Sequence, residues 1–266
     1  MTTTSTVPRT VLCMKWGTVF PADYVNVLFN ACRAATTRPF RFVCLTDDAA
    51  GLLPGIEALP IPDIGLTQAE WRAPGVWPKL ALYLPDLHGL RGRCLFIDLD
   101  MMVLGGLDEM FDRPGEFITT DMGEGWRPGG RPGAAPEPGT CVFAFDFGQE
   151  SRILNAFLAD KARAMRDFQN EQDFAGAHAR SMAFWPEGWV ISFKRHLRRP
   201  IGIDLLLAPK RPPEGTRILA FHGTPRPIAL IPERAGFWDR FPHMGHGQVG
   251  WLRDYWISHG GRMPPF

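Results

Sequence analysis

Three short apolar runs in the first hundred residues constrain the fold of this chain more than any other feature. They occupy residues 10–14, 41–45 and 94–97, and each is rich in β-forming residues and followed by polar or turn residues. Between them, residues 23–35 carry apolar side chains at helical spacing, and residues 77–84 form a second helix candidate. Alternating strands and helices predict right-handed βαβ units. We therefore expect an α/β fold with a mainly parallel central sheet flanked by helices.

Composition and charge narrow the class of protein. The chain has 266 residues, of which 45% are apolar and 21% charged, as is usual for a globular protein. Its formal net charge of +1 predicts no general attraction to nucleic acid or to an anionic membrane. Any binding of a polyanion must therefore come from a local site.

The N-terminal residues, the lack of long apolar runs and the cysteines together predict the cellular compartment. Residues 1–10 are polar and lack the apolar core of a secretory signal, and no run approaches the roughly 18 apolar residues that span a bilayer. The five cysteines are widely spaced without metal-site spacing, which favours free thiols in a reducing compartment. We expect a cytoplasmic protein, with peripheral contact to the inner face of the membrane as an open alternative.

The second half of the chain adds a loop, two strands, a helix and an aromatic terminus. Residues 123–139 hold six glycines and four prolines, which indicates a long loop, either a functional lid or an irregular excursion. Residues 141–145 and 218–221 are predicted strands, and residues 151–168 are predicted to form one amphipathic helix.

The last thirty residues are rich in aromatic side chains. Trp251, Tyr255 and Trp256 fall at helical spacing, which favours packing on the body of the protein over an acceptor platform or a membrane contact. We expect one domain over residues 8–232 with a C-terminal extension over residues 233–266 that packs on or near it.

Asp98 and Asp100 are the residues most indicative of chemistry. They follow an apolar strand, and on a strand residues two apart point the same way. Neighbouring carboxylates repel each other unless a cation lies beside them, and oxygen ligands suit Mg²⁺ or Mn²⁺. Such an ion takes up the charge that develops on a diphosphate leaving group. A solvated turn is the alternative, but a second apolar run at 101–104 places the pair within a buried frame, where unpaired charge is costly.

The order of several motifs resembles that of the GT-A glycosyltransferases, specifically the retaining family 8 type. The resemblance extends from Val11 to about Pro227 and implies a GT-A fold and sugar transfer from a nucleotide diphosphate. It rests on the DxD strand, the segment after it, a strand lining the sugar site, a DQD-like triplet and a late His-Gly pair. These stand at residues 95–100, 105–111, 139–146, 171–173 and 222–223.

The chain also departs from the pattern of that family. Thr140-Cys141 stands where the family has Ser-Gly, and Glu171 replaces the first Asp of the triplet. The segment after Gly223 lacks the usual Lys, and Arg226 is the residue available to bind phosphate there. These differences place the chain in a divergent branch and leave the sugar unnamed.

The resemblance implies roles for the strand-end residues. Asp100 is the first choice for metal coordination, Asp98 for metal or ribose contact, and His222 for the third metal ligand through a neutral imidazole nitrogen. Gln172, Asp173 and Glu171 are the candidates near the anomeric carbon. A front-side mechanism needs no protein nucleophile, whereas a covalent route would use Glu171 or Asp173.

The remaining candidates would bind the donor. Each of them also has a structural interpretation: the strand-end residues could cap turns, the tryptophan could pack in the core, and the lysine could occupy a solvated helix position. The predicted donor-binding residues are Trp16, Thr46, Asp47, Lys79, Asp98, Asp121, Thr140, Gly223 and Arg226.

The sequence therefore predicts a metal-dependent glycosyltransferase that uses Mn²⁺ or Mg²⁺. The expected partners are a nucleotide-sugar donor, with UDP-sugar as first choice, and a carbohydrate or glycolipid acceptor, but not nucleic acid. One alternative is a DxD phosphatase or a nucleotidyltransferase, although Met102 and the absence of a Gly-rich basic loop after the first strand disfavour both. The other is a non-catalytic carbohydrate- or partner-binding protein on a degenerate transferase fold.

Overall fold

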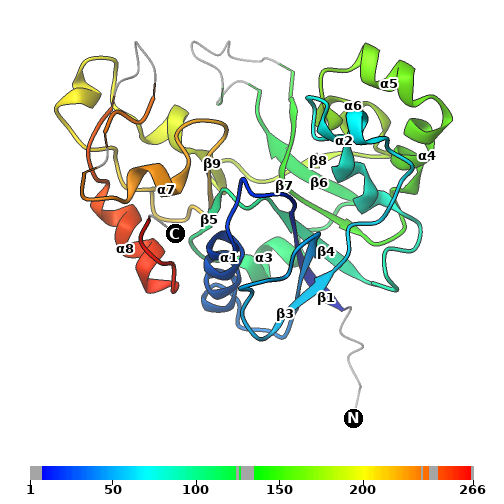
Figure 1. Cartoon of the computed structure of the whole chain (residues 1–266), viewed down its shortest axis with the longest axis horizontal. Coiled ribbons are helices and arrows are strands. Elements are labelled where there is room, and N and C mark those ends of the chain that lie inside the picture. The colour runs from blue at the N-terminus through cyan, green and yellow to red at the C-terminus, as the bar shows by residue number, and fades with distance from the viewer. Residues whose placement is uncertain (1–7, 124–125, 127–134, 235, 240–244, 265–266) are drawn as a thin grey trace.

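A seven-stranded sheet forms the centre of the molecule (Figure 1). The computed structural model describes residues 8–123, 126, 135–234, 236–239 and 245–264. The strand order is β3-β2-β1-β4-β7-β6-β8. These strands are β1 (Arg9–Lys15), β2 (Arg41–Thr46), β3 (Ile56–Leu59), β4 (Arg93–Ile97), β6 (Phe117–Asp121), β7 (Pro138–Asp146) and β8 (Ala183–Phe184).

The pairing confirms the expected mixed α/β architecture. β1 pairs in parallel with both β2 and β4, β2 pairs in parallel with β3, and β6 pairs in parallel with β8. β7 runs antiparallel between β4 and β6. The three apolar runs at the start of the chain are therefore adjacent strands, and their carboxyl ends share one edge of the sheet.

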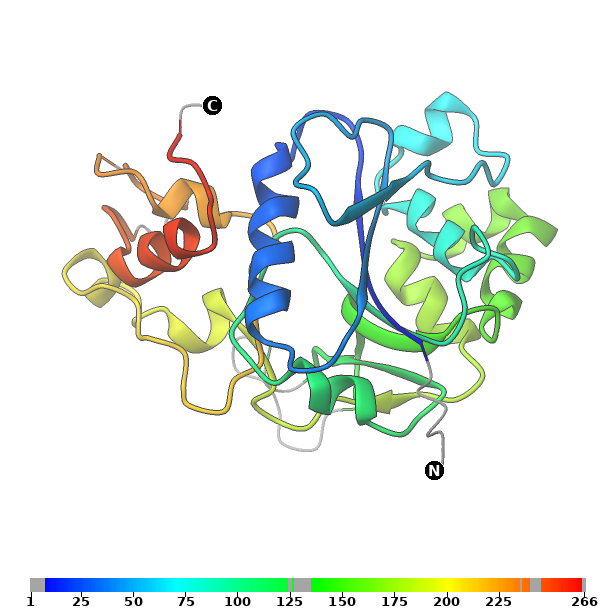
Figure 2. The same cartoon turned by 90° about the horizontal axis from the view of Figure 1, so that it is seen from below.

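Helices and turns cover both faces of the sheet (Figure 2). Successive residues of a strand point to opposite faces, so Val11 and Cys13 pack with α1 while Leu12 and Met14 pack on the other side. The second face is covered by the 3₁₀ helix η1 together with α4 and α6. The helical elements around this sheet are α1 (Ala22–Ala34), α2 (Gln68–Arg72), η1 (Trp77–Tyr83), α3 (Leu107–Asp112), α4 (Ser151–Ala159), α5 (Lys161–Asp167) and α6 (Glu171–His178).

The prediction of one helix over residues 151–168 is wrong. The chain breaks at Asp160, whose backbone angles of φ −158° and ψ 80° are not helical. The Asp160 carboxylate accepts a hydrogen bond from the backbone N–H of Arg163 and so caps the start of α5. Within α4, Leu158 is 45% exposed, whereas Ile153, Leu154 and Phe157 are buried.

A smaller three-stranded sheet extends the fold beyond β4. Its order is β5-β10-β9, with β10 antiparallel to β5 and parallel to β9. It joins the segment just after Asp100 to the segment just before His222. Its strands and the remaining helical elements are β5 (Met101–Val103), β9 (Val190–Ser192), η3 (Phe193–Leu197), η4 (Ile203–Leu205), β10 (Ile218–Ala220), α7 (Pro227–Leu230) and α8 (Gly250–Ser258).

The aromatic C-terminal segment packs on the body of the protein. Trp256 is 3% exposed and packs edge-on against Tyr24 of α1, and the Tyr255 hydroxyl donates to the carbonyl of Val103. The Asp23 carboxylate accepts three hydrogen bonds from the backbone and guanidinium of Arg262. The end of the chain is thus bound to the first helix.

Three further sequence features can be placed. All five cysteines are free thiols, and four of them are fully buried. Most of the Gly/Pro-rich loop at 123–139 lies outside the described residues, although Trp126 is described and buried. Within the part of the chain that the structure describes, no helix has both the length and the apolar character needed to cross a bilayer.

Candidate functional site

One pocket at the carboxyl-end edge of the sheet collects most of the predicted site residues. Its volume is about 440 Å³. Side chains from η1, the β4–β5 link, β7, the start of α6 and the end of β10 line it. They include Lys79, Asp98, Asp100, Thr140, Glu171, Gln172 and His222, and the backbone of Gly223 completes the rim.

Asp98 and Asp100 lie in the link between β4 and β5 and not on a strand. The strand-alternation argument for their common orientation is therefore wrong, yet both line the pocket. The link is fixed by backbone hydrogen bonds from Asp98 N to Cys141 O at 2.9 Å and from Phe221 N to Asp100 O at 3.2 Å. Burial and the neighbouring Asp98 charge raise the pKa of Asp100 to about 7. Among the described residues, its carboxylate has no side-chain hydrogen-bond partner.

Lys79 is the cation at the floor of the pocket. It is buried, and its Nζ atom donates to both Asp98 oxygens at 3.0 Å and to the carbonyl of Thr140 at 2.6 Å. The Phe96 ring lies 4.4 Å from Nζ and adds a cation–π contact. Burial opposes the charge, but Asp98 and Glu171 outweigh it, so the pKa of Lys79 is raised and the side chain stays charged.

Glu171, at the start of α6, is the second acid beneath the pocket. Its Oε1 atom accepts a 2.6 Å hydrogen bond from the Thr140 hydroxyl and lies 3.6 Å from Lys79 Nζ. Its Oε2 atom is buried without a hydrogen-bond partner among the described residues. Burial raises the pKa of Glu171 to about 7, although Lys79 and the Thr140 hydrogen bond act against the rise.

Gln172 and Asp173 diverge at the start of α6. The Gln172 Oε1 atom accepts a 3.2 Å hydrogen bond from the backbone N–H of Thr140, and the side chain lines the pocket. Asp173 does not line the pocket, and its backbone N–H donates to the Asn170 side chain. The pocket therefore receives Glu171 and Gln172 from this triplet, while Asp173 lies outside it.

His222 follows β10 and faces the pocket from the small sheet. Its Nε2 atom lies 2.7 Å from the Ser192 hydroxyl, and its ring lies 5.6 Å from the Trp126 ring. Burial, with the nearby charges of Lys194 and Arg195, lowers the pKa of His222 to about 4. The imidazole is therefore neutral at physiological pH, as a metal ligand must be.

A second hollow of about 550 Å³ adjoins the first. Gly75 and Val76 line both, while Trp16 and Asp47 line only the second. The Asp47 Oδ2 atom accepts a 2.9 Å hydrogen bond from the backbone N–H of Gly17, which joins the ends of β1 and β2. Together the two hollows form an extended site along the strand ends.

Three predicted donor-binding residues lie outside both hollows. Thr46 is buried and exchanges hydrogen bonds with the backbone of Asp48 in a turn. The Asp121 carboxylate accepts from the N–H groups of Gly123 and Glu137 and so closes the base of the loop. Arg226 lies with its guanidinium 4.6 Å from the Phe20 ring, and its charge favours ionised Asp100.

The donor set of the pocket fits a divalent cation in its chemistry. Asp98, Asp100 and neutral His222 offer two carboxylates and an imidazole, and the raised pKa of Asp100 reflects a charge that a cation would offset. Among the described residues, however, no group of three or more His, Cys, Asp or Glu side chains is gathered closely enough to hold a metal. Lys79 and Ser192 already contact Asp98 and His222.

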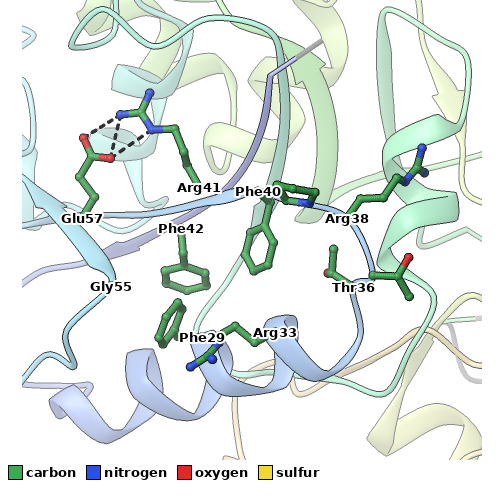
Figure 3. A pocket seen from close by; sticks show the side chains of 11 residues that line it. Phe29, Arg33, Thr36, Arg38, Phe40, Arg41, Phe42, Gly55 and Glu57 are labelled. Carbon is green, nitrogen blue, oxygen red and sulfur yellow. Dashed lines mark hydrogen bonds and ion pairs between the residues drawn. The ribbon is translucent and has the colours of Figure 1, made fainter. Parts of the chain in front are cut away.

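Larger hollows at the opposite edge of the sheet have a structural explanation. They measure about 580 and 990 Å³ and lie at the amino ends of β1, β2 and β4. Three of their arginines are held in ion pairs: Arg41 binds Glu57 with two nitrogens (Figure 3), and Arg9 and Arg38 both bind Asp108 and Asp112. Ligands of open α/β sheets bind at the other edge, which favours the strand-end pocket as the functional site.

Sequence reasoning missed several contacts that shape the pocket. It did not find Ser192, whose hydroxyl contacts His222, or the ion pair of Lys79 with Asp98. It also left Cys141 and Trp126 without a role, although both line the pocket. A lysine at the start of a helix with Asp98 nineteen residues later gives no local signal, because the contact depends on sheet order.

Comparison with solved structures identifies the fold. The galactosyltransferase LgtC, solved in complex with donor and acceptor sugar analogues, matches with a TM-score of 0.58 over 97% of both chains at 10% identity. GlyE of Streptococcus pneumoniae TIGR4 matches with a TM-score of 0.54 at 13% identity, and the bifunctional WbbM with 0.57 at 14%. Those matches cover 94% and 99% of this chain, which spans 60% of GlyE and 51% of WbbM.

The chain thus has the GT-A fold of these glycosyltransferases. No family profile matches its sequence, and no curated protein does.

Proposed function

We propose that this chain transfers a sugar from a nucleoside-diphosphate donor to an acceptor hydroxyl, with a UDP-sugar as the first donor to test. The observation that carries the proposal is the strand-end pocket, where Asp98, Asp100, Gln172 and His222 meet around one cavity. A GT-A fold with that pocket at the carboxyl ends of its strands supports the same assignment.

A cation bound in the pocket would suit a diphosphate leaving group, because the lining itself holds more acidic than basic side chains. Cleavage at the anomeric carbon leaves negative charge on the diphosphate, which a preorganised cation stabilises. Mn²⁺ or Mg²⁺ held by Asp98, Asp100 and His222 would supply that charge. Such ions bind through one or two carboxylates plus substrate phosphates, so a complete set of protein ligands is not needed before the donor arrives.

The two adjoining hollows suit the two halves of a nucleotide sugar. The hollow of Trp16 and Asp47 would take the nucleoside, with an aromatic ring for the base and a carboxylate for ribose hydroxyls. The pocket of Thr140 and Gln172 would take the sugar, and the diphosphate would pass Gly75, which lines both. Thr46, Asp121 and Arg226 would act outside this path.

We favour retention of configuration by a front-side route, in which the leaving phosphate helps deprotonate the acceptor. Of the two carboxylates considered as nucleophiles, only Glu171 lines the pocket. It is bound to the Thr140 hydroxyl and close to Lys79, which lowers its nucleophilicity. Gln172, which lines the same pocket, would then be the neutral group beside the sugar.

Asp100→Asn tests the assignment against Asp146→Asn, an exposed carboxylate at the opposite edge of the sheet. Transfer from a panel of UDP- and GDP-sugars with Mn²⁺ is measured, together with thermal stabilisation by nucleotide. We expect UDP with Mn²⁺, but not Mn²⁺ alone, to stabilise the wild type. Asp100→Asn should lose at least about a hundredfold in transfer rate, whereas Asp146→Asn should match the wild type.

Two results would contradict the assignment. Equal transfer by Asp100→Asn and the wild type would refute the metal role. Stabilisation by nucleotide without turnover of any donor would favour a binding protein on the same fold.

A further inference from the structure

A short segment near the small sheet exposes an unusual number of large apolar side chains. Between residues 201 and 207, five Ile and Leu residues are exposed, and Leu206 reaches 84%. They make up five of the twelve exposed large hydrophobic residues in the described part of the chain. Their exposed fractions are Ile201 58%, Ile203 45%, Leu205 38%, Leu206 84% and Leu207 52%. Contiguous exposure of this kind marks interaction surfaces more often than isolated apolar residues do.

The same segment carries a concentrated positive charge. Residues 194–211 contain six Lys and Arg residues and a single acid, so their formal charge is +5 while the whole chain is only +1. The acid, Asp204, is buried and paired with Arg198 at 2.8 Å. Arg195, Lys210 and Arg211 are exposed beside the apolar residues. The exposed surface of residues 194–211 is therefore basic as well as apolar, and we call these residues the basic-apolar segment.

The fold holds this segment in a defined shape. Arg198 also pairs with Asp239 at 3.0 Å, and the backbone N–H of Lys210 donates to the carbonyl of Leu197 at 2.8 Å, which closes the loop. The Arg199 Nε atom donates to the carbonyl of Ala208. The turn η4 at the tip is closed by the N–H of Leu207 donating to Ile203 O. The exposed apolar side chains therefore lie on a loop whose backbone is fixed by these ion pairs and hydrogen bonds.

We propose that the basic-apolar segment docks on the surface of an anionic lipid bilayer, with its isoleucines and leucines in the interfacial region and its basic side chains on the headgroups. Apolar burial and attraction to anionic lipid reinforce each other in such contacts. The sugar-phosphate surface of a nucleic acid is charged and would leave most of the five aliphatic side chains without an apolar partner. A second copy of the chain would bring two surfaces of the same charge together.

The segment is also connected to the strand-end pocket. It follows Ser192, the N-cap residue of η3, whose hydroxyl lies 2.7 Å from the Nε2 atom of His222. In Figure 1 the yellow part of the chain, which includes η4, lies at the upper left, and the dark blue strand β1 runs upward from the N-terminus, so its carboxyl end points to the same upper side. A docked molecule would hold its pocket near the lipid surface, which would favour a lipid-linked acceptor if the proposed transfer is correct.

Vesicle co-sedimentation of the full chain tests the docking. The probes are phosphatidylcholine vesicles with and without about 30% phosphatidylglycerol. The variants are Leu206→Ser with Leu207→Ser, and Lys210→Glu with Arg211→Glu; Leu158→Ser, 45% exposed on α4, is the matched control. We expect the wild type and the control to bind only the anionic vesicles, and each double variant to bind at least about tenfold more weakly.

Three outcomes would overturn docking: no sedimentation of the wild type, equal binding by the double variants, or equal binding to neutral vesicles. Light scattering tests whether a second copy of the chain binds this surface instead. A wild type that dimerises but does not bind vesicles, and whose dimer is lost in the leucine variant, would assign the surface to a second copy. Stabilisation by UDP with Mn²⁺ is measured on the same samples. If the protein fails to bind vesicles but is still stabilised by UDP with Mn²⁺, the docking proposal fails and the proposed function does not.

Discussion

The Nζ atom of Lys79 lies 3.0 Å from both carboxylate oxygens of Asp98, so the cation at the floor of the pocket is bound to the first acid of the DLD segment. The Lys79 side chain is 4% exposed and that of Asp98 35%. Removing one partner of such a pair leaves the other charge poorly solvated, whereas removing both does not.

Lys79→Met should therefore destabilise the protein, by roughly 2–4 kcal/mol, since Asp98 keeps some access to water. The double variant Lys79→Met, Asp98→Asn should recover at least half of that loss. Urea denaturation without nucleotide measures the free energy of unfolding of both. A single variant as stable as the wild type would show that the pair contributes nothing to the fold.

Thr140→Val should cost about 1–3 kcal/mol, because it removes the hydroxyl that binds the buried Glu171 carboxylate at 2.6 Å. Thr140→Ser keeps the hydroxyl and is the matched control. Thermal unfolding of both variants distinguishes the hydrogen bond from side-chain volume. Equal losses in the two variants would assign the effect to packing.

Asp23→Asn should weaken the attachment of the C-terminal segment in a pH-dependent way. Hydrogen bonds from Arg262 lower the pKa of Asp23 below its ordinary value, despite opposing burial. The stabilisation is therefore present above the unfolded pKa of about 3.9 and is lost as pH falls through the lower folded pKa.

The variant should be about 1–3 kcal/mol less stable than the wild type at pH 7, and the difference should be smaller at about pH 3, which lies below the unfolded pKa of about 3.9. Urea titrations at both pH values measure it. Asp254→Asn, an exposed carboxylate on α8, serves as the control. A difference that is the same at both pH values would contradict the ionic contribution.

Gly75→Ala should distort the ridge between the two hollows. Gly75 has φ +113°, and a Cβ there would lie 2.7 Å from Trp77 Nε1 and 3.0 Å from the carbonyl of Gln169. We expect a loss of about 1–3 kcal/mol in stability together with weaker nucleotide binding. Gly188→Ala, at φ +80° with open space around it, isolates the backbone cost. Equal effects in the two variants would refute the steric argument.

The central strands could be predicted because each is a continuous apolar run, which is typical of strands buried on both faces. β7 was recognised as a strand, but its antiparallel place between β4 and β6 depends on long-range pairing that no local pattern encodes. The break at Asp160 was missed because the apolar spacing continues across it, and only the capping hydrogen bond reveals the second helix.

The residues of the site could be predicted in part for the same reason. Asp98, Asp100 and His222 follow apolar strands, and strand ends meet at one edge of a parallel sheet. Asp121 and Asp173 have equally suggestive positions in the sequence, yet Asp121 accepts hydrogen bonds at the base of a loop, and Asp173 lies at a helix start outside both hollows. Side-chain direction at the ends of elements is decided by local capping, which the sequence pattern does not reveal.

The positions of the free thiols allow their alkylation to report on both the pocket and the central sheet. Cys13, Cys44 and Cys94 lie on adjacent central strands and are closed to alkylating reagents while the sheet is intact. Of the five cysteines, Cys141 alone lines the strand-end pocket, so an alkylating reagent can reach its thiol through the pocket. Burial raises the pKa of Cys141 to about 12, so this alkylation is slow. Mass spectrometry of the alkylated peptides would therefore report ligand binding in the pocket through Cys141 and opening of the sheet through the three strand cysteines. Both would be measured in one sample, without any substitution in the chain.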